Sequence, residues 1–308
     1  MRIVFWGTPE FAVPSLSALL GEGADVVGVV TQPDRPVGRH RVLTPPPVKV
    51  RALEDGIPVL QPEKPRGEAF YAELAALAPD LHVVVAYGNL LPAAVIDGPR
   101  HGTINVHASL LPRWRGAAPI EAAILAGDTE TGVSIQQMVL ALDAGDVLLE
   151  LRTPLLADET GGELTNRLSE LGASALLEVL PLIEMGAVSR TPQDDTHVTY
   201  AGKVTREAAR LRWADDAASV ARAIRAYDPR PGAWSVLRGD DVKLYGARVE
   251  QDANGDPGLV LEIAEHGLLV ACGTGAVRIG YAHPAGKRRV AALDWHQGRG
   301  VQVGDAFV

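Results

Sequence analysis

Short apolar runs alternate with amphipathic stretches through roughly the first 190 residues of the chain. Several runs are apolar throughout, which is typical of strands that are covered on both faces of a sheet. Strands are predicted at residues 2–6, 25–31, 58–60, 81–86, 103–107, 133–138 and 147–152. Helical spacing is found between and after them, at residues 14–20, 48–55, 67–77, 119–126 and 161–185. The alternation predicts an α/β domain with a mostly parallel sheet.

The pattern changes after the long helix. Residues 186–203 contain prolines, threonines and acidic residues with little periodicity, which is typical of a linker. Beyond one helix at 217–226, the chain consists of short strand-like runs at 233–237, 242–249, 259–263, 267–271 and 276–279, separated by glycines. Such strands favour a small β-barrel. We therefore expect a domain over residues 1–185, a linker over 186–203 and a barrel domain over 204–308.

The composition narrows the class of protein. The chain has 308 residues, of which 47% are hydrophobic and 22% charged, as in an ordinary soluble enzyme. We find neither a secretion signal nor an apolar run approaching the roughly 18 residues of a membrane span. The single cysteine, Cys272, excludes an internal disulfide and a cysteine-cluster metal site. These features predict a cytoplasmic protein.

The charge is distributed unevenly along the chain. Residues 1–202 carry 14 Lys and Arg against 25 Asp and Glu, whereas residues 203–308 carry 15 against 13. Basic residues gather in two loops, one with Arg35, Arg39 and Arg41 and the other with Lys287, Arg288 and Arg289. Such patches can hold a polyanion although the whole chain has a net charge of −9. Each patch alone could equally be solvated surface.

The strongest chemical signal is a pair of polar residues on one predicted strand. Asn105 and His107 are two residues apart, so both side chains point to the same face. Imidazole can accept a proton near neutral pH, and a positioned amide N–H can stabilise an oxyanion. A carboxylate in the loop L-D-A-G-D could orient the imidazole, but the spacing does not distinguish Asp143 from Asp146. The set is typical of acyl transfer.

Other nucleotide and hydrolase motifs are missing. The first strand is followed by Gly7-Thr8-Pro9 without a G-x-G-x-x-G, so a nicotinamide cofactor is not supported. We find no P-loop and no H-E-x-x-H zinc motif. The lack of a G-x-S-x-G elbow makes Ser109 a poor candidate for a hydrolytic nucleophile.

Together these motifs resemble the methionyl-tRNA formyltransferase family along essentially the whole chain. The resemblance rests on F-W-G-T-P-E-F-A (5–12), T-Q-P-D-R-P-V-G-R (31–39), V-V-V-A-Y-G (83–88), N-V-H-A-S-L-L-P-R-W-R-G-A-A-P-I (105–120), E-T-G-V-S-I-Q-Q-M (130–138) and L-D-A-G-D (142–146). It implies a Rossmann-like formyltransferase domain followed by an OB-like β-barrel domain. It further implies formyl transfer from 10-formyltetrahydrofolate, a co-substrate, to the α-amine of methionyl initiator tRNA, by a monomer without a metal.

The resemblance also assigns roles to residues of this chain. Asn105, His107 and Asp143 match the family's catalytic positions, which selects Asp143 over Asp146 for that role. The residues expected to contact the folate are Tyr87, Gly88, Leu90, Ser109, Leu110, Leu111, Pro112 and Asp146. Those expected to contact the tRNA are Arg35, Arg39, Arg41, Lys287 and Arg288.

Two other functions share part of this pattern. A formyltransferase acting on a small amine, such as glycinamide ribonucleotide or an amino sugar nucleotide, would use the same Asn–His–Asp set without the basic loop at 31–39 or the barrel. A non-catalytic RNA-binding protein would have no need of the intact set. The chain departs from the family pattern at Ala108, Ala144 and Arg230, none of which removes a group from the proposed chemistry.

Overall fold

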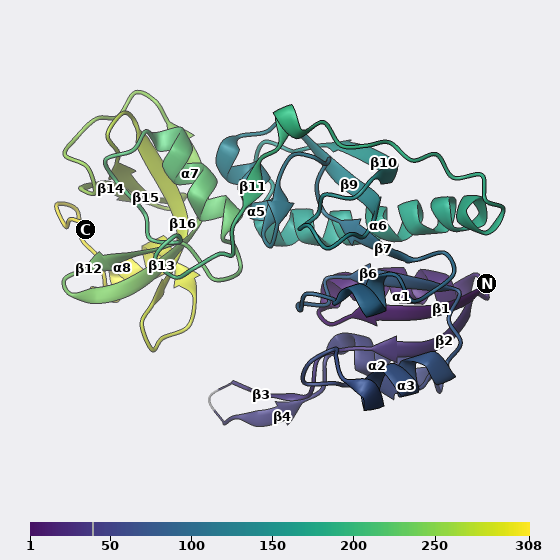
Figure 1. The fold of residues 1–308 in the computed structure, drawn as a ribbon. Helices are drawn as coiled ribbons and strands as arrows, with labels where there is room; N and C mark the ends of the chain where they lie inside the picture. Colours follow the sequence, from purple (N-terminus) through teal and green to yellow (C-terminus); the bar gives the residue numbers. More distant parts are fainter. Residues whose placement is uncertain (39) are drawn as a thin grey trace. The chain divides into compact units, whose positions relative to one another are not determined.

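The computed structural model describes residues 1–38 and 40–308, which form two compact units (Figure 1). The first unit comprises Met1–Pro119, Glu130–Pro154 and Thr165–Ala201, and the second comprises Ile120–Thr129, Leu155–Leu164 and Gly202–Val308. The domain boundary therefore differs from the single linker at 186–203 expected from the sequence. Two short internal segments belong to the second unit, and residues 186–201 belong to the first.

A sheet of seven strands, among the described residues, forms the centre of the first unit in the order β10-β9-β7-β6-β1-β2-β5. Its strands are β1 (Arg2–Gly7), β2 (Asp25–Val30), β5 (Val59–Leu60), β6 (Leu81–Val85), β7 (Thr103–His107), β9 (Glu130–Gln137) and β10 (Val147–Pro154). Strands β7, β6, β1, β2 and β5 are parallel, whereas β9 is antiparallel to both of its neighbours. The mostly parallel sheet predicted from the sequence is confirmed.

The strand order reverses at the centre of this sheet. From β1 the chain moves outward through β2 to β5 and then returns to β6, on the other side of β1. Open α/β sheets bind ligands beside such a reversal, at the carboxyl ends of the strands. At this edge the hydroxyl of Thr8 donates to the carbonyl oxygen of Tyr87 at 2.8 Å, and Gln32 Nε2 donates to the same oxygen at 3.3 Å. The loops after β1, β2 and β6 are thereby joined.

Helices cover both faces of the sheet. The helices are α1 (Val13–Gly21), α2 (Pro47–Glu54), α3 (Glu68–Ala76), α4 (Ala93–Ile96) and α6 (Gly161–Glu184), with 3₁₀ turns η1 (Glu10–Ala12) and η2 (Asp195–His197). On one face Trp6 and Val84 pack with Phe70 of α3 and with α4. On the other face α6 approaches β7 so closely that a Cβ at Gly172 would lie 2.8 Å from Val106.

The first unit also contains two small strand pairs outside the main sheet. The segment after β2 carries a hairpin of β3 (Arg35–Val37) and β4 (Val42–Thr44), visible in Figure 1. Strand β11 (Tyr200–Ala201) pairs in parallel with β8 (Arg115–Gly116). This second pair ties the segment expected to be a linker to the loop that follows β7.

The second unit is built on an antiparallel sheet of order β12-β13-β16-β15-β14, with β17 beside β16. Its elements are α5 (Pro119–Ala126), α7 (Ala217–Ala226), β12 (Trp234–Leu237), β13 (Asp240–Glu250), β14 (Val260–Ala264), β15 (Gly267–Ala271), β16 (Ala276–Pro284), β17 (Val290–Ala291) and α8 (Ala292–Gln297). Its core contains the apolar face of α7, including Val220 and Ile224, together with Leu244 and Phe307. The β-strand domain predicted for this part is confirmed, and its strands are antiparallel.

The last residues of the chain connect the two edges of this sheet. Phe307 pairs with Leu237 at the end of β12, and Ala306 pairs with Leu259 beside β14. Backbone bonds on the two sides include Val308 N to Val236 O at 3.0 Å and Val260 N to Asp305 O at 2.8 Å. Edge strands that would otherwise present unpaired N–H and C=O groups are therefore joined, as in a small barrel.

No helix in the described part of the chain combines the length and the apolar character required to cross a membrane.

Candidate active site

His107 is the last residue of β7 and lies at the carboxyl edge of the sheet. Its side chain is 6% exposed, and Nε2 lies 3.0 Å from the carbonyl oxygen of Trp114. A carbonyl oxygen can only accept, so we assign the ring hydrogen to Nε2, which leaves Nδ1 of the neutral ring as a proton acceptor. Nδ1 faces Oδ2 of Asp143 at 3.9 Å. A protonated ring would therefore present an N–H to an acceptor on each side.

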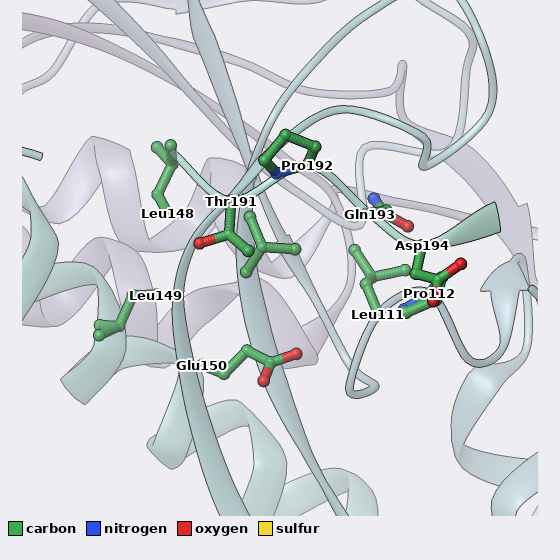
Figure 2. A pocket seen from close by; sticks show the side chains of 10 residues that line it. Leu111, Pro112, Leu148, Leu149, Glu150, Thr191, Pro192, Gln193 and Asp194 are labelled. Atoms are coloured by element: carbon green, nitrogen blue, oxygen red, sulfur yellow. The ribbon is translucent and has the colours of Figure 1, made fainter. Parts of the chain in front are cut away.

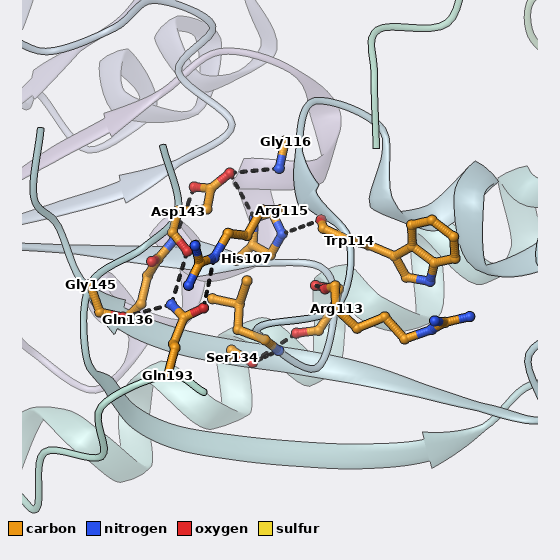
Figure 3. A network of polar contacts seen from close by, with 12 residues as sticks. His107, Arg113, Trp114, Arg115, Gly116, Ser134, Gln136, Asp143, Gly145 and Gln193 are labelled. Carbon is orange, nitrogen blue, oxygen red and sulfur yellow. Dashed lines mark hydrogen bonds and ion pairs between the residues drawn. The ribbon is translucent and has the colours of Figure 1, made fainter. Parts of the chain in front are cut away.

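Asp143 lies in the loop between β9 and β10, and its carboxylate is held from two directions (Figure 3). Oδ2 accepts from the backbone N–H of Gly116 at 2.8 Å, and Oδ1 accepts from Nε2 of Gln136 at 2.9 Å. Of the two aspartates that spacing alone left open, Asp143 is the one at ion-pair distance from His107. The structure thus brings this predicted pair together.

Asn105 occupies the same face of β7 as His107. It pairs with Val84 of β6 on one side and with Gln136 of β9 on the other. Side chains that are directly opposite one another on neighbouring strands lie on the same face. The amide of Asn105 is therefore in the same row as Gln136, which holds Asp143. Two segments distant in the sequence converge on the face that carries His107.

The loop after β7 is fastened to the neighbouring strand. Ser134 of β9 accepts from the backbone N–H of Leu111 at 3.0 Å and donates to the carbonyl oxygen of Ser109 at 2.8 Å. Ser109 in turn donates to the carbonyl oxygen of Arg113 at 2.5 Å. Leu110 packs over β9, where a Cβ at Gly132 would come within 2.6 Å of Leu110 Cδ2. The predicted folate segment is thus an ordered loop.

A cavity of about 400 Å³ opens beside this loop (Figure 2). It is lined by Leu111, Pro112, Val147, Leu148, Leu149, Glu150, Thr191, Pro192, Gln193 and Asp194. Its walls combine apolar and polar surface in nearly equal parts, and the carboxylate of Glu150 is one of the polar groups. Two of the predicted folate residues, Leu111 and Pro112, contribute to this lining.

The other predicted folate residues lie in two loops, the one after β6 and the one between β9 and β10. Tyr87 is 1% exposed and packs edge-on against Trp6, with ring centroids 5.2 Å apart. Burial raises the pKa of the Tyr87 hydroxyl to about 12. Its side chain therefore belongs to the core, and the ligand contacts we expect there would come from the loop backbone. Gly88 follows with a φ of +94°, and Leu90 is 81% exposed. Asp146 is partly exposed, and its carbonyl oxygen accepts from Gln137.

The predicted tRNA residues lie in two groups, one in each unit. Arg35 of β3 pairs with Glu63 at 3.1 Å, and Arg41 is exposed in the hairpin turn, immediately before β4. Arg39, the arginine that the family resemblance selects, lies outside the described residues. Lys287 and Arg288 are exposed in the turn after β16.

Sequence patterns missed the residues that hold the site together. Arg115 is 5% exposed, and its Nε donates to Oε1 of Gln193 at 2.9 Å. Gln193 and Gln136 both hold the Asp143 loop. Gln136 could have been found, because the alternation along β9 places it on the same face as Asn105, directly across from it. Gln193 lies in an aperiodic segment that gives no such signal.

Comparison with known proteins finds matches that span nearly the whole chain. Residues 1–180 match the family described as formyl transferase, and residues 203–300 match its C-terminal domain. The chain is 49% identical over 299 residues to a methionyl-tRNA formyltransferase of Pseudomonas paraeruginosa, covering 97% of this chain and 96% of that protein. It is 47% identical over 308 residues to one from Stutzerimonas stutzeri, covering 100% and 98%.

Solved structures with the same fold are more distant in sequence. HypX from Aquifex aeolicus in complex with tetrahydrofolic acid is similar with a TM-score of 0.65 and 23% identity, covering 96% of this chain and 46% of HypX. The chain thus spans about half the length of HypX. WlaRD, a sugar 3N-formyl transferase, is similar with a TM-score of 0.68 and 17% identity, covering 93% and 98%. These two likenesses concern the fold alone.

Proposed function

The chain belongs to the family of methionyl-tRNA formyltransferases, and from this membership we propose how its own residues carry out the reaction. The reaction moves the formyl group of 10-formyltetrahydrofolate to the α-amine of methionyl initiator tRNA. We assign it to Asn105, His107 and Asp143. The observation that carries this assignment is the position of the His107 ring between two acceptors, the carbonyl of Trp114 and the carboxylate of Asp143.

In the proposed mechanism the neutral amine attacks the formyl carbon, forming a new C–N bond and a tetrahedral intermediate. Nδ1 of His107 takes the proton that the amine loses. The resulting imidazolium has both N–H groups directed at acceptors, and Asp143 supplies the negative charge that favours it. The bond from the carbon to N10 of the folate then breaks, and the same proton is returned to that nitrogen. The nitrogen of the substrate ends as an amide.

Asn105 serves the oxygen of the formyl group in this proposal. That oxygen gains negative charge as the amine attacks, and an amide N–H aimed at it stabilises the charge. Losing one such donor costs about 3–4 kcal/mol in comparable acyl transfers. Asn105 and His107 are held on one strand between two neighbours, so the donor and the base keep a fixed separation.

We propose direct transfer without a covalent enzyme intermediate. The hydroxyl of Ser109, the nearest in the loop after His107, is engaged as a donor to the carbonyl of Arg113. The thiol of Cys272 is 2% exposed, and burial raises its pKa to about 12, so it stays protonated near neutral pH. Neither is a good nucleophile. Bringing two substrates into contact then supplies much of the rate.

The folate contacts are our proposal and are supported by exposed apolar residues in two loops. Leu90, in the loop after β6, is 81% exposed, and Leu140, in the loop that carries Asp143, is 71% exposed. Large exposed leucines fit the flat rings of a pterin and an aminobenzoyl group. We propose that these loops and the segment from Ser109 to Pro112 bind the folate.

The tRNA contacts are proposed for the basic loop at residues 35–41 and for Lys287 and Arg288. Arginine contacts to phosphates make binding dependent on salt, and the unstacked end of an RNA is open to recognition of its bases. We further propose that the enzyme acts as a monomer in the cytoplasm, where charged initiator tRNA is used.

A formylation assay with alternative acceptors tests this function. The purified protein is given 10-formyltetrahydrofolate with methionyl initiator tRNA, with glycinamide ribonucleotide or with an amino sugar nucleotide. Of the three acceptors, we expect only the tRNA to be formylated. In His107→Ala we expect kcat to fall by several orders of magnitude with little change in tRNA affinity. Preferential turnover of a small amine would replace the proposal with the rival enzyme. Full turnover by His107→Ala would remove His107 from the mechanism.

A further inference from the structure

We propose that Gln193 is a positioning residue that holds the Asp143 loop in its working conformation. Its Nε2 donates to the carbonyl oxygens of Asp143 and Gly145 at 2.9 and 2.7 Å (Figure 3). An amide NH₂ has two hydrogens, so both are used on this one loop. The inference rests on the proposed function, because it concerns how the carboxylate partner of His107 is kept in place.

The orientation of the Gln193 amide is fixed by its other end. Its Oε1 accepts from Nε of Arg115 at 2.9 Å, and Arg115 can donate but not accept. A flipped amide would set its NH₂ against the guanidinium and its oxygen against two carbonyls. Arg115 is itself held, because its side chain is 6% exposed and pairs with Asp195 at 3.0 Å. One arrangement alone satisfies all of these groups.

Two features of its backbone show why the Asp143 loop needs hydrogen bonds from neighbouring side chains. Asp143 has a φ of 48°, in the left-handed region that residues with a Cβ enter at a cost. Two residues later the chain passes so close to β9 that a Cβ on Gly145 would collide with the carbonyl oxygen of Gln137. A backbone that is both strained and closely packed persists only where neighbouring groups determine it. Gln193 supplies two of the bonds that do so.

The hydrogen bonds from Gln193 matter for catalysis because they help to set the distance between Asp143 and His107. Nδ1 of His107 and Oδ2 of Asp143 are 3.9 Å apart, already beyond the range of a direct hydrogen bond. A further displacement of the loop would weaken the interaction on which the imidazolium depends. The hydrogen bonds of Gln193 go to the loop backbone and not to His107 or to the Asp143 carboxylate, so the proposal has it act through the position of Asp143.

The test compares Gln193→Ala and the nearly isosteric Gln193→Glu with wild type in the formylation assay. Glutamate fills the same space and can pair with Arg115, but it cannot donate to the two carbonyls. We expect kcat to fall by roughly tenfold to 100-fold in both variants, with KM for each substrate within about twofold of wild type. Thr196→Ala is the control, because its hydroxyl bonds within the same segment to Asp194 and not to the Asp143 loop. We expect wild-type turnover from it.

A double-mutant cycle separates positioning from a general structural role. If Gln193 acts through Asp143, adding Gln193→Ala to an Asp143→Asn enzyme should lower kcat by less than about twofold, since the interaction it protects is already lost. An undiminished effect in that background would overturn the proposal, as would a single variant with wild-type kcat. If Gln193→Ala fails to fold, Gln193→Glu decides alone. Absence of formylation by the wild-type protein would instead refute the proposed function.

Discussion

Acidification should weaken the first unit through one buried histidine. His82 of β6 is 1% exposed, and its Nδ1 contacts the carbonyl oxygen of Val95 at 3.1 Å. Its ring packs against Trp6 with centroids 5.3 Å apart. Burial in this apolar surrounding lowers the pKa of His82 from 6.5 to about 4, because the charged ring would lose its hydration. The folded protein therefore keeps His82 neutral at pH values where an unfolded chain protonates it.

The sign and the size of the effect follow from that difference. Between pH 6.5 and pH 4 the unfolded state binds more protons at His82 than the folded state, so the free energy of unfolding rises with pH. The contribution is complete above pH 6.5 and is lost as the pH falls towards 4. A separation of this size in pKa corresponds to roughly 3 kcal/mol, of the order of a third of the stability of a typical domain.

Urea denaturation followed by circular dichroism, at several pH values from 7 to 4, measures this term. His82→Asn is the matched variant, because an amide N–H can still donate to the carbonyl of Val95 without titrating. Its absolute stability will be lower because of the smaller side chain. The difference between the two proteins should shrink by roughly 3 kcal/mol as the pH falls from 7 to 4, since all other titrating groups are shared. Parallel curves at every pH would show that burial of His82 does not control this dependence.

Three further substitutions test the clamps and the barrel. Gly145→Ala places a Cβ in collision with the carbonyl oxygen of Gln137, so the loop must move. We expect kcat to fall at least roughly tenfold in the formylation assay and the unfolding free energy to fall by about 1–3 kcal/mol in thermal melting. Wild-type values of both would contradict this packing. Gln136→Leu removes the amide that donates to Asp143, so kcat should fall. It also removes the buried Oε1 of Gln136, which has no hydrogen-bond partner among the described residues, so the unfolding free energy should change by less than about 1 kcal/mol. Phe307→Ala should lower the free energy of unfolding by about 3–5 kcal/mol in urea denaturation, because it removes a ring that is 2% exposed where the chain end closes the sheet. A loss of less than about 0.5 kcal/mol, as at an exposed site, would refute this.

Strands and the residues on them were predictable because their physical signal is local. Alternation along residues 103–107 places Asn105 and His107 on one face, and the apolar run at 81–86 gives a strand buried on both sides. The structure has both elements within one residue of the expected bounds. The same logic predicted the short strands of the second unit. Periodicity reports which side of an element is covered, and it does so without knowledge of the neighbours.

The remaining parts depend on contacts between distant segments, which no local pattern records. Residues 186–201 lack periodicity, yet they pair with β8 and β10 and carry Gln193. Their order comes from hydrogen bonds to partners that are tens of residues away, such as Arg115. The closing of the barrel by residues 305–308 has the same character, since single bridges join two edges. Such segments resemble linkers in composition because they do not cover a face of their own.

The site combines residues on paired strands with residues on a loop that distant segments hold in place. This combination explains which substitutions should affect activity and which should affect stability. Asn105 and His107 sit on a strand whose neighbours on both sides are fixed by backbone pairing, so their positions follow from the sheet itself. Asp143 sits on a loop with a left-handed backbone, and side chains from β9 and from the segment after α6 determine its place. Substitutions in the sheet core should therefore affect stability before activity. Substitutions in the clamps should affect activity first, because the sheet remains intact while the charge that supports the imidazolium moves.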